Sequence, residues 1–261
     1  MKVTFLGVGS AFSQKHGNSN VLIESGDVKL LIDCSLACSS ALRQYGLSLR
    51  DITHVCITHL HADHITGLEE IAFKTRLNYH TRLTLLSTQS LLDRLWNYSL
   101  RGGLEYIELN PGEEISQTLD DFFEVCPLAA QEWGSICGSP ELKFSLRRTN
   151  HVKGMESYGL LVEESPGGLE KRFLFSGDTK FDPALIADGA KNASIIFHDC
   201  QLYDSGEHNI NGVHASYQQL RQLDPDIRRR MWLYHYGDSD LPDAVGDGFA
   251  GFIQRLQSFT R

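Results

Sequence analysis

Short hydrophobic runs rich in β-branched and aromatic residues recur along the chain and predict many short strands. Stretches with the helical spacing of apolar residues lie between several of them. We expect strands at 2–9, 20–25, 28–34, 54–58, 82–88, 122–128, 143–149, 158–164, 172–178, 193–199 and 231–238. We expect helices at 36–46, 67–78, 89–99, 183–190, 215–223 and 247–257. This alternation predicts an α/β sandwich whose first third is rich in hairpins.

The bulk composition is that of one compact domain. The chain has 261 residues, and 41% of them are hydrophobic, which is enough for a large core. No apolar run approaches the roughly 18 residues of a membrane span, and the opening stretch MKVTFLGVGS predicts a strand instead of a signal-peptide core. We therefore expect a single domain over 1–261, a cytoplasmic location and no membrane partner.

Charge and cysteine usage exclude other classes of protein. The formal net charge of -9 argues against an extended nucleic-acid partner, because such binding depends on neutralising phosphates with Lys and Arg. The six cysteines are scattered and form no CxxC pair, so we expect reduced, buried thiols in preference to disulfides or a thiolate metal site. They are Cys34, Cys38, Cys56, Cys126, Cys137 and Cys200.

The stretch THLHADHITG directly after the strand at 54–58 holds the candidate chemistry. His59 and His61 can converge on one metal ion through alternate positions, while Asp63 and His64 turn toward a second. Imidazole and carboxylate groups suit zinc, and they also suit manganese and iron. Crowding these polar groups together without a cation would be costly, so the motif predicts a metal site.

The remaining ligands of a two-metal site must come from distant positions. A catalytic zinc takes about three protein ligands and keeps a position open for water. The candidates lie at strand ends beside turn residues. His151 follows the strand at 143–149, Asp178 ends the stretch RFLFSGD, and His235 lies in the last predicted strand.

With these residues in order, the chain resembles the metallo-β-lactamase-fold hydrolases over essentially its whole length. That superfamily has an HxHxDH motif, a later His, a Gly-Asp after a strand, and a final His. The resemblance implies an αββα sandwich that binds two Zn²⁺, with Mn²⁺ or Fe²⁺ as alternatives. It implies one ion on His59, His61 and His151 and the other on Asp63, His64 and His235, with Asp178 bridging both.

A second constellation points to the phosphodiesterase side of the superfamily. FHDCQ is followed by GVHASYQQL, in which His214 precedes a helix and Ser216 lies nearby. This resembles ribonuclease Z, where a comparable histidine assists phosphodiester cleavage. A histidine near the metals can protonate the leaving alkoxide, so we expect this role for His214, against the alternative of purely local hydrogen bonds. For His198 a supporting role and a catalytic one stay equally open.

Ribonuclease Z itself fits less well than an enzyme for a small phosphodiester. Its family usually carries a long arm for transfer RNA between the later His and the bridging Asp. Here only the segment 152–177 separates His151 from Asp178. The net acidity points the same way.

A narrower resemblance covers segments from residue 5 to residue 238. The stretches GVGSAF, NSNVLIES, SYGLLVEE, FSGDTKF, IIFHDCQ, GVHASYQQL and MWLYHYGD are similar to the anti-Pycsar family. This implies a homodimeric dizinc phosphodiesterase that hydrolyses 3′,5′-cyclic nucleotides such as cyclic CMP and cyclic UMP to 5′-monophosphates. If the chain is phage-encoded, it would counteract Pycsar antiphage signalling in the bacterial host cytoplasm.

The mechanism expected from these residues has two protein groups. Asp63 orients the attacking water and accepts its proton, and His214 protonates the leaving 3′-oxygen. Three alternatives stay open: a ribonuclease Z-like transfer RNA 3′ endonuclease, an ester or lactone hydrolase on the same fold, and a protein that binds a nucleotide without cleaving it. Six aromatic residues are candidates for stacking on a base, although packing is the default for each. They are Phe12, Tyr106, Trp133, Tyr158, Tyr203 and Tyr236.

Overall fold

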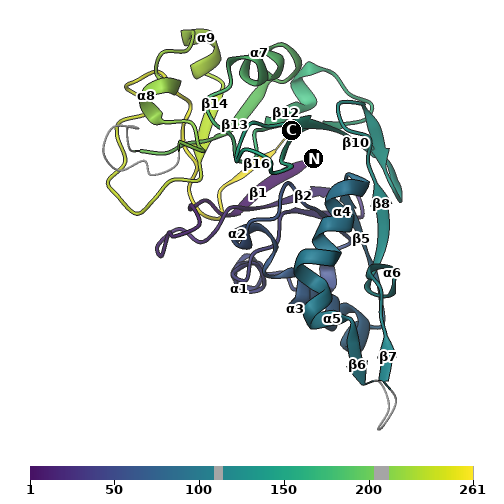
Figure 1. Ribbon diagram of the computed structural model, residues 1–261. Helices are drawn as coiled ribbons and strands as arrows, with labels where there is room; N and C mark the ends of the chain where they lie inside the picture. The colour runs from purple at the N-terminus through teal and green to yellow at the C-terminus, as the bar shows by residue number, and fades with distance from the viewer. Residues whose placement is uncertain (109–113, 203–211, 261) are drawn as a thin grey trace.

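Two seven-stranded sheets lie face to face in the computed structural model, which describes residues 1–108, 114–202 and 212–260 (Figure 1). The first sheet has the strand order β16-β1-β2-β3-β4-β5-β8 and the second β15-β14-β13-β12-β11-β10-β9. A separate hairpin of β6 (Tyr106–Glu108) and β7 (Glu114–Ser116) extends from the body. The predicted sandwich is therefore present, and each sheet draws mainly on one half of the chain.

The strands of the two sheets agree with the predicted runs, with a few additions. The first sheet contains β1 (Lys2–Gly7), β2 (Asn20–Ser25), β3 (Val28–Ile32), β4 (His54–Cys56), β5 (Leu83–Ser87), β8 (Phe123–Pro127) and β16 (Ser258–Thr260). The second contains β9 (Gly134–Ile136), β10 (Ser139–Arg148), β11 (Tyr158–Glu164), β12 (Arg172–Phe175), β13 (Ile195–Asp199), β14 (Met231–Tyr234) and β15 (Gly251–Phe252).

Each sheet is antiparallel on one side and parallel on the other. In the first sheet β16, β1, β2 and β3 pair antiparallel, and β3, β4, β5 and β8 run parallel. In the second, β9 to β12 pair antiparallel, whereas β12, β13, β14 and β15 run parallel. Parallel strands end at the same edge of a sheet, so the loops that follow β12, β13 and β14 start close together.

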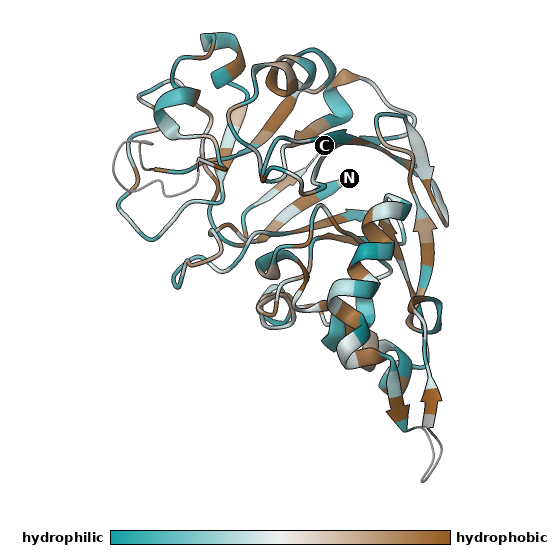
Figure 2. Cartoon of the chain, in the orientation of Figure 1, coloured by the Kyte–Doolittle hydropathy of each residue, from teal (hydrophilic) through white to brown (hydrophobic). Residues whose placement is uncertain are grey.

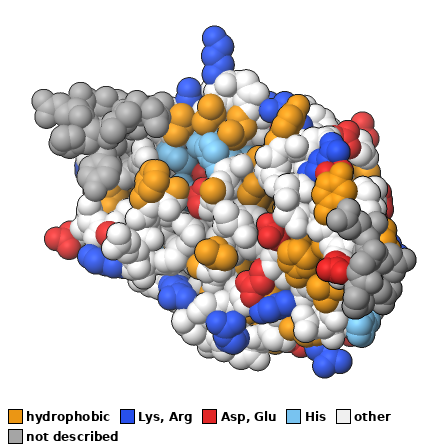
Figure 3. Space-filling view, turned by 60° about the horizontal axis from the view of Figure 1, so that its bottom comes forward, with side chains coloured by type: hydrophobic (Ala, Val, Ile, Leu, Met, Phe, Trp, Pro, Cys, Tyr) orange, Lys and Arg blue, Asp and Glu red, His pale blue; other side chains and the backbone are white. Residues whose placement is uncertain are grey.

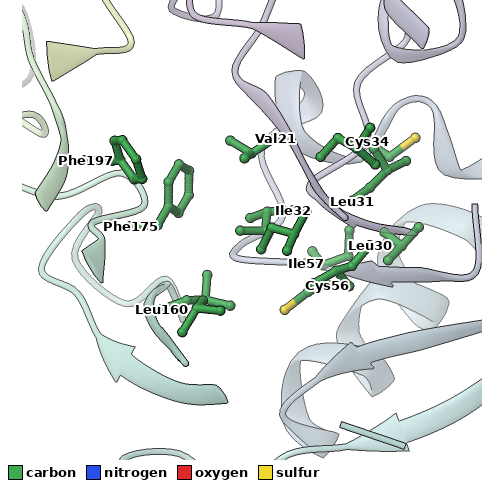
Figure 4. Packing of buried hydrophobic residues seen from close by; sticks show 14 of the residues in the cluster. Val21, Leu30, Leu31, Ile32, Cys34, Cys56, Ile57, Leu160, Phe175 and Phe197 are labelled. Carbon is green, nitrogen blue, oxygen red and sulfur yellow. The ribbon is translucent and has the colours of Figure 1, made fainter. Parts of the chain in front are cut away.

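The core lies between the two sheets. The ring of Phe5 on β1 meets those of Phe197 and Phe175 across the interface, at centroid distances of 5.0 and 6.4 Å. Figure 4 shows these two phenylalanines facing Val21 and Ile32 of the first sheet. Figure 2 shows the hydrophobic residues concentrated on the strands. Strands such as β5 and β13 are buried at every residue, because the opposite sheet covers one face and helices cover the other.

Helices cover the outer faces and complete the four layers (Figure 1). The first-half helices are α1 (Cys38–Tyr45), α2 (Ala62–Ile65), α3 (Leu68–Phe73), α4 (Gln89–Leu95), α5 (Arg101–Leu104) and α6 (Leu119–Phe122), and the later ones α7 (Pro183–Asn192), α8 (Tyr217–Leu220) and α9 (Pro225–Arg228). Single turns of 3₁₀-helix occupy Leu49–Asp51 and Leu169–Lys171, and π-helical segments continue α3 and α4 over Lys74–Tyr79 and Trp96–Leu100. Among the described residues, no helix is long and apolar enough to cross a membrane.

The helix predicted at 247–257 is wrong. The structure has turns there, interrupted by the short strand β15. Gly248 and Gly251 adopt φ of 85° and 142°, and Leu256 adopts 64°. A right-handed helix excludes such backbone angles, so the apolar spacing in this segment instead comes from residues that pack into the end of the second sheet.

The expectation of six reduced thiols is also wrong. Cys126 and Cys137 form a disulfide with their Cα atoms 6.3 Å apart. The bond joins the edge strand β8 of the first sheet to the residue after β9, the edge strand of the second. The sequence carries no signal for this pair because only the folded sandwich brings the two edges together. The other four cysteines are free and buried, as expected.

Candidate metal centre

The histidine-rich loop begins where β4 ends and leads into the short helix α2. His59 is fully buried, whereas His61 lies half-buried at the position before α2, with extended backbone angles. The first turn of α2 then carries Asp63 and His64, and the His64 amide donates to the His61 carbonyl at 3.0 Å. This change from extended to helical backbone directs the four side chains toward a common region.

The three distant candidates follow strands of the second sheet. His151 comes after β10, Asp178 after β12 and His235 after β14. His235 has a φ of 64°, and its amide donates to the Val8 carbonyl of the first sheet at 2.7 Å. The structure thus supports a strained backbone at this residue by tying the end of β14 to the end of β1.

All seven predicted residues converge in two groups that share one carboxylate. Within each group the candidate ligand atoms lie within 4.8 Å of one another. One group is His59, His61, His151 and Asp178, and the other is Asp63, His64, Asp178 and His235. Asp178 is the residue that the two groups have in common.

Asp178 reaches this position because Gly177 precedes it. Gly177 has a φ of 59°, and a Cβ on it would lie 2.3 Å from the carbonyl oxygen of Tyr158. Only glycine allows this turn to pass so close to β11.

We expect Gly177→Ala to lower the free energy of unfolding by about 3 kcal/mol, from backbone strain and overpacking together. Gly26→Ala is the matched control, because Gly26 has a φ of 55° and open space around its Cβ position. The control should lose only about 1 kcal/mol. Denaturant titration of both variants measures the difference, and equal losses would contradict the close approach at Gly177.

Several buried ligand atoms lack a hydrogen bond within the described part of the chain. They are Nε2 of His59, His64 and His235, and Oδ1 of Asp178. Leaving such atoms unpaired in a buried site is costly, and a bound cation removes that cost. The donor set of imidazoles and carboxylates fits zinc, manganese or iron.

In three histidines of the site, the protein holds the ring nitrogen opposite Nε2. Nδ1 of His64 lies 2.6 Å from Asp33 Oδ2, and Nδ1 of His151 lies 2.8 Å from the Val213 carbonyl. Nδ1 of His59 lies 3.1 Å from the Thr58 hydroxyl. Such contacts fix the ring orientation and leave Nε2 for a metal, as in known metal sites.

The charges of the site suit cation binding. Burial lowers the pKa of His59 well below its ordinary value and also lowers the pKa of His61 and His151. Their neutral form is the one that binds a metal. Burial raises the pKa of Asp178, but His235 and His64 outweigh this and hold it well below its usual range. The shared carboxylate therefore stays ionised.

His214 lies against both metal-capable groups. Its ring centroid is 4.6 Å from that of His235 and 4.9 Å from that of His151. Its Nδ1 lies 2.7 Å from Asp199 Oδ2, so Nε2 is the nitrogen left to face a substrate. Burial lowers the pKa of His214, but the hydrogen bond that Nδ1 donates to Asp199 and the charge of Asp178 outweigh this effect and raise the pKa above its ordinary value.

Sequence reasoning assigned no role to Asp33 and Asp199, which orient His64 and His214. Both are fully buried at the ends of strands, Asp33 after β3 and Asp199 as the last residue of β13. The sequence signal that could have identified them is an acidic residue directly at the end of a hydrophobic run. His198, for which two roles stayed open, is fully buried, and its Nδ1 lies 2.7 Å from the Asp199 carbonyl.

Part of the site is accessible from the surface, because His61 and Asp63 are only partly buried. Figure 3 shows histidine side chains at the surface beside a group of hydrophobic ones. Of the aromatic residues considered for base stacking, Tyr158 and Tyr236 are buried, whereas Phe12, Tyr106 and Trp133 are exposed. Tyr203 lies outside the described residues.

Comparison with known proteins places the chain in a family. The family model described as "Anti-Pycsar protein Apyc1" matches residues 1–259. The anti-Pycsar protein Apyc1 of Paenibacillus harenae is 38% identical over 242 residues, which cover 92% of this chain and 91% of that protein. The Apyc1 protein of Bacillus phage 010DV004 is also 38% identical, over 246 residues and 92% and 90% of the two chains.

The fold is shared with proteins of much lower sequence identity. The metallo-β-lactamase fold protein YhfI from Bacillus subtilis has a TM-score of 0.75 at 15% identity, covering 99% of this chain and 98% of its own. The predicted fold and the predicted family are both confirmed. The chain belongs to the anti-Pycsar Apyc1 family and is a metal-dependent hydrolase with a metallo-β-lactamase fold.

Proposed function

We propose that this protein hydrolyses 3′,5′-cyclic nucleotides, among them cyclic CMP and cyclic UMP, to 5′-monophosphates with two zinc ions per chain. The observation that carries the proposal is the convergence of seven metal-capable residues in two groups that share Asp178, with the ring of His214 stacked on His235 of one group and tilted against His151 of the other. Membership in the Apyc1 family supports the choice of substrate. By removing these nucleotides the protein would counteract Pycsar signalling.

In this proposal each group holds one ion. His59, His61 and His151 form the first set, and Asp63, His64 and His235 form the second, while Asp178 serves both. Manganese and iron suit the same donors. When bound, two such ions lower the pKa of water and stabilise the negative charge of the phosphate in the transition state.

Asp63 is the proposed base. Its Oδ2 lies 3.2 Å from Nε2 of His64 and 3.7 Å from Nε2 of His235, which places the carboxylate inside the second group. It is the more exposed of the two carboxylates, since 9% of its side chain is accessible against 2% for Asp178. Asp63 therefore orients the attacking water and accepts its proton.

His214 is the proposed acid. Against the effect of burial, the hydrogen bond to Asp199 and the charge of Asp178 raise its pKa, which favours the protonated ring, and Asp199 holds Nδ1. Nε2 then donates a proton to the 3′-oxygen as the bond from that oxygen to phosphorus breaks, which leaves the phosphate on the 5′-oxygen. Asp199 acts through His214 as a positioning residue.

The rival substrate, transfer RNA, has less support. The segment between His151 and Asp178 is occupied largely by β11 and β12 and contains no arm. The net charge of -9 also disfavours a long polyanion. We therefore propose a small substrate, and we propose a homodimer as the working form, to be tested by mass measurement in solution.

The test is incubation of the zinc-loaded protein with cyclic CMP, UMP, AMP and GMP, with a lactone as control and products separated by chromatography. We expect conversion of the cyclic nucleotides to 5′-monophosphates. Cleavage of the lactone alone would keep the fold and overturn the function. Tight binding of a cyclic nucleotide with no product over hours would favour the alternative that the protein binds a nucleotide without cleaving it.

A further inference from the structure

The loop between β1 and β2 carries an exposed phenylalanine. Phe12 is 92% exposed, more than any other large hydrophobic residue in the described part of the chain. Figure 1 shows this loop as a dark purple projection from the body. Single exposed apolar side chains are ordinary on protein surfaces, so exposure alone assigns no role.

A clamp from a distant part of the chain fixes this loop. The carboxylate of Asp238 accepts hydrogen bonds from the Ser13 hydroxyl at 2.6 Å and from the amides of Gln14 and Lys15 at 2.9 and 3.3 Å. The Lys15 ammonium donates to the Asp238 carbonyl at 3.1 Å. The residues directly after Phe12 are thus held in one arrangement, which reduces the entropy that the loop would lose on binding a ligand.

The same clamp places the loop at the metal centre. Asp238 lies three positions after His235, whose amide bonds the Val8 carbonyl, and the Ser10 amide donates to the Tyr236 carbonyl at 3.1 Å. The loop therefore starts at the end of β1, where Val8 bonds to His235. Its later residues bond to Tyr236 and Asp238, which follow His235 in the chain. Phe12 lies two residues after Ser10, on the loop that these contacts hold beside the residues following His235.

The other aromatic residues considered for base stacking, among those that the structure describes, are less suitably placed than Phe12. Tyr158 and Tyr236 are buried, and their rings are not free to stack on a ligand. Trp133 lies next to edge strand β9 with the Arg172 guanidinium 5.4 Å from its ring. Tyr106 lies on the β6–β7 hairpin, which Figure 1 shows at the far end of the molecule from β14 and α8.

We propose that Phe12 is the stacking platform for the nucleobase of the substrate and that Asp238 is the residue that positions it. The inference rests on the proposed function and adds to it the residue that binds the base. Every base has a π-face, so a single phenylalanine accepts pyrimidines and purines alike. We therefore expect the enzyme to accept cyclic nucleotides with different bases, because stacking on Phe12 does not recognise the hydrogen-bonding groups of a base.

The first test compares Phe12→Ala with wild type on cyclic CMP and on a 3′,5′-cyclic phosphate of 1-deoxyribose, which has no base. Stacking energies predict that KM for cyclic CMP rises on the order of tenfold in the variant. The value of kcat should change by less than about twofold, because this binding is uniform between ground and transition states. For the base-free substrate, KM and kcat should be the same in Phe12→Ala and wild type. Phe12→Trp should have a KM for cyclic CMP close to that of wild type.

A binding measurement tests the same point without turnover. The phosphorothioate analogue of cyclic CMP, which resists hydrolysis, should bind Phe12→Ala on the order of tenfold more weakly in calorimetry. Asp238→Asn should weaken binding in the same direction while leaving metal content unchanged. Tyr106→Ala is the matched control, an exposed aromatic on the hairpin, and should bind as wild type does.

Four results would overturn the inference. Wild-type hydrolysis of cyclic CMP with an unchanged KM in Phe12→Ala would reject Phe12 and keep the proposed function. An equal loss with the base-free substrate, or a change from dimer to monomer, would assign Phe12 to structure or to a subunit contact. A wild-type protein that neither binds the phosphorothioate nor hydrolyses any cyclic nucleotide would reject both the inference and the proposed function.

Discussion

His61→Ala is expected to lose bound metal and to lower cyclic CMP turnover by more than about 100-fold. His61 is half-buried at the edge of its group, and its Nδ1 lies 3.1 Å from Nε2 of His151, so its removal takes away a ligand without opening the core. Loss of groups that only orient a ligand already costs 10- to 100-fold, so loss of a ligand itself should cost more. Asp63→Ala should behave in the same way.

The matched control for this prediction is His80→Asn. His80 is exposed and has a φ of 53°, a conformation that asparagine tolerates. This variant should keep wild-type metal content and activity. Metal is measured by mass spectrometry after gel filtration, and turnover on the same samples. A His61→Ala protein with full metal content and full activity would contradict the ligand set.

His214→Ala is expected to slow kcat for cyclic CMP by about 10²- to 10⁴-fold while keeping its metal. His214 touches both groups, and a third possible set of ligands joins it to Asp178, Asp199 and His235. Metal analysis separates the two roles, because a ligand would take metal with it and an acid would not. Metal loss equal to that of His61→Ala would contradict the role of acid.

The leaving group gives a second readout for His214. The p-nitrophenolate released from bis(p-nitrophenyl) phosphate needs no proton, so this substrate should lose little activity in His214→Ala. The pH profile gives a third. An acid with a raised pKa is protonated below that pKa, so wild-type kcat should fall as the pH rises through it, and the variant should lack this fall.

The sequence was sufficient for the fold and for the seven metal-capable residues, because both depend on local patterns. Buried strands appear as hydrophobic runs, and a strand end beside Gly177 and Asp178 marks a turn at the edge of a sheet. The order of the motifs then tells which strand ends meet. His214 was identified by the resemblance of its segment to ribonuclease Z, and the need for an acid at the leaving oxygen agreed with that choice.

What the sequence could not supply depends on contacts between distant segments. The Cys126–Cys137 disulfide requires the two sheets to be in place, and the clamp of Asp238 on the loop after β1 requires the β1 and β14 ends to meet. Asp33 and Asp199 touch histidines far along the chain. The segment 247–257 failed for a different reason. Its apolar residues have helical spacing, but Gly248, Gly251 and Leu256 adopt positive φ angles that a right-handed helix does not allow.

The most direct test of the central claim is a zinc titration of the metal-free protein with cyclic CMP turnover measured at each step. Two groups that share Asp178 predict that turnover rises until about two equivalents of zinc are bound per chain and then stays constant. Full turnover in the presence of a strong chelator would contradict this account, and so would saturation with zinc that yields no 5′-monophosphate.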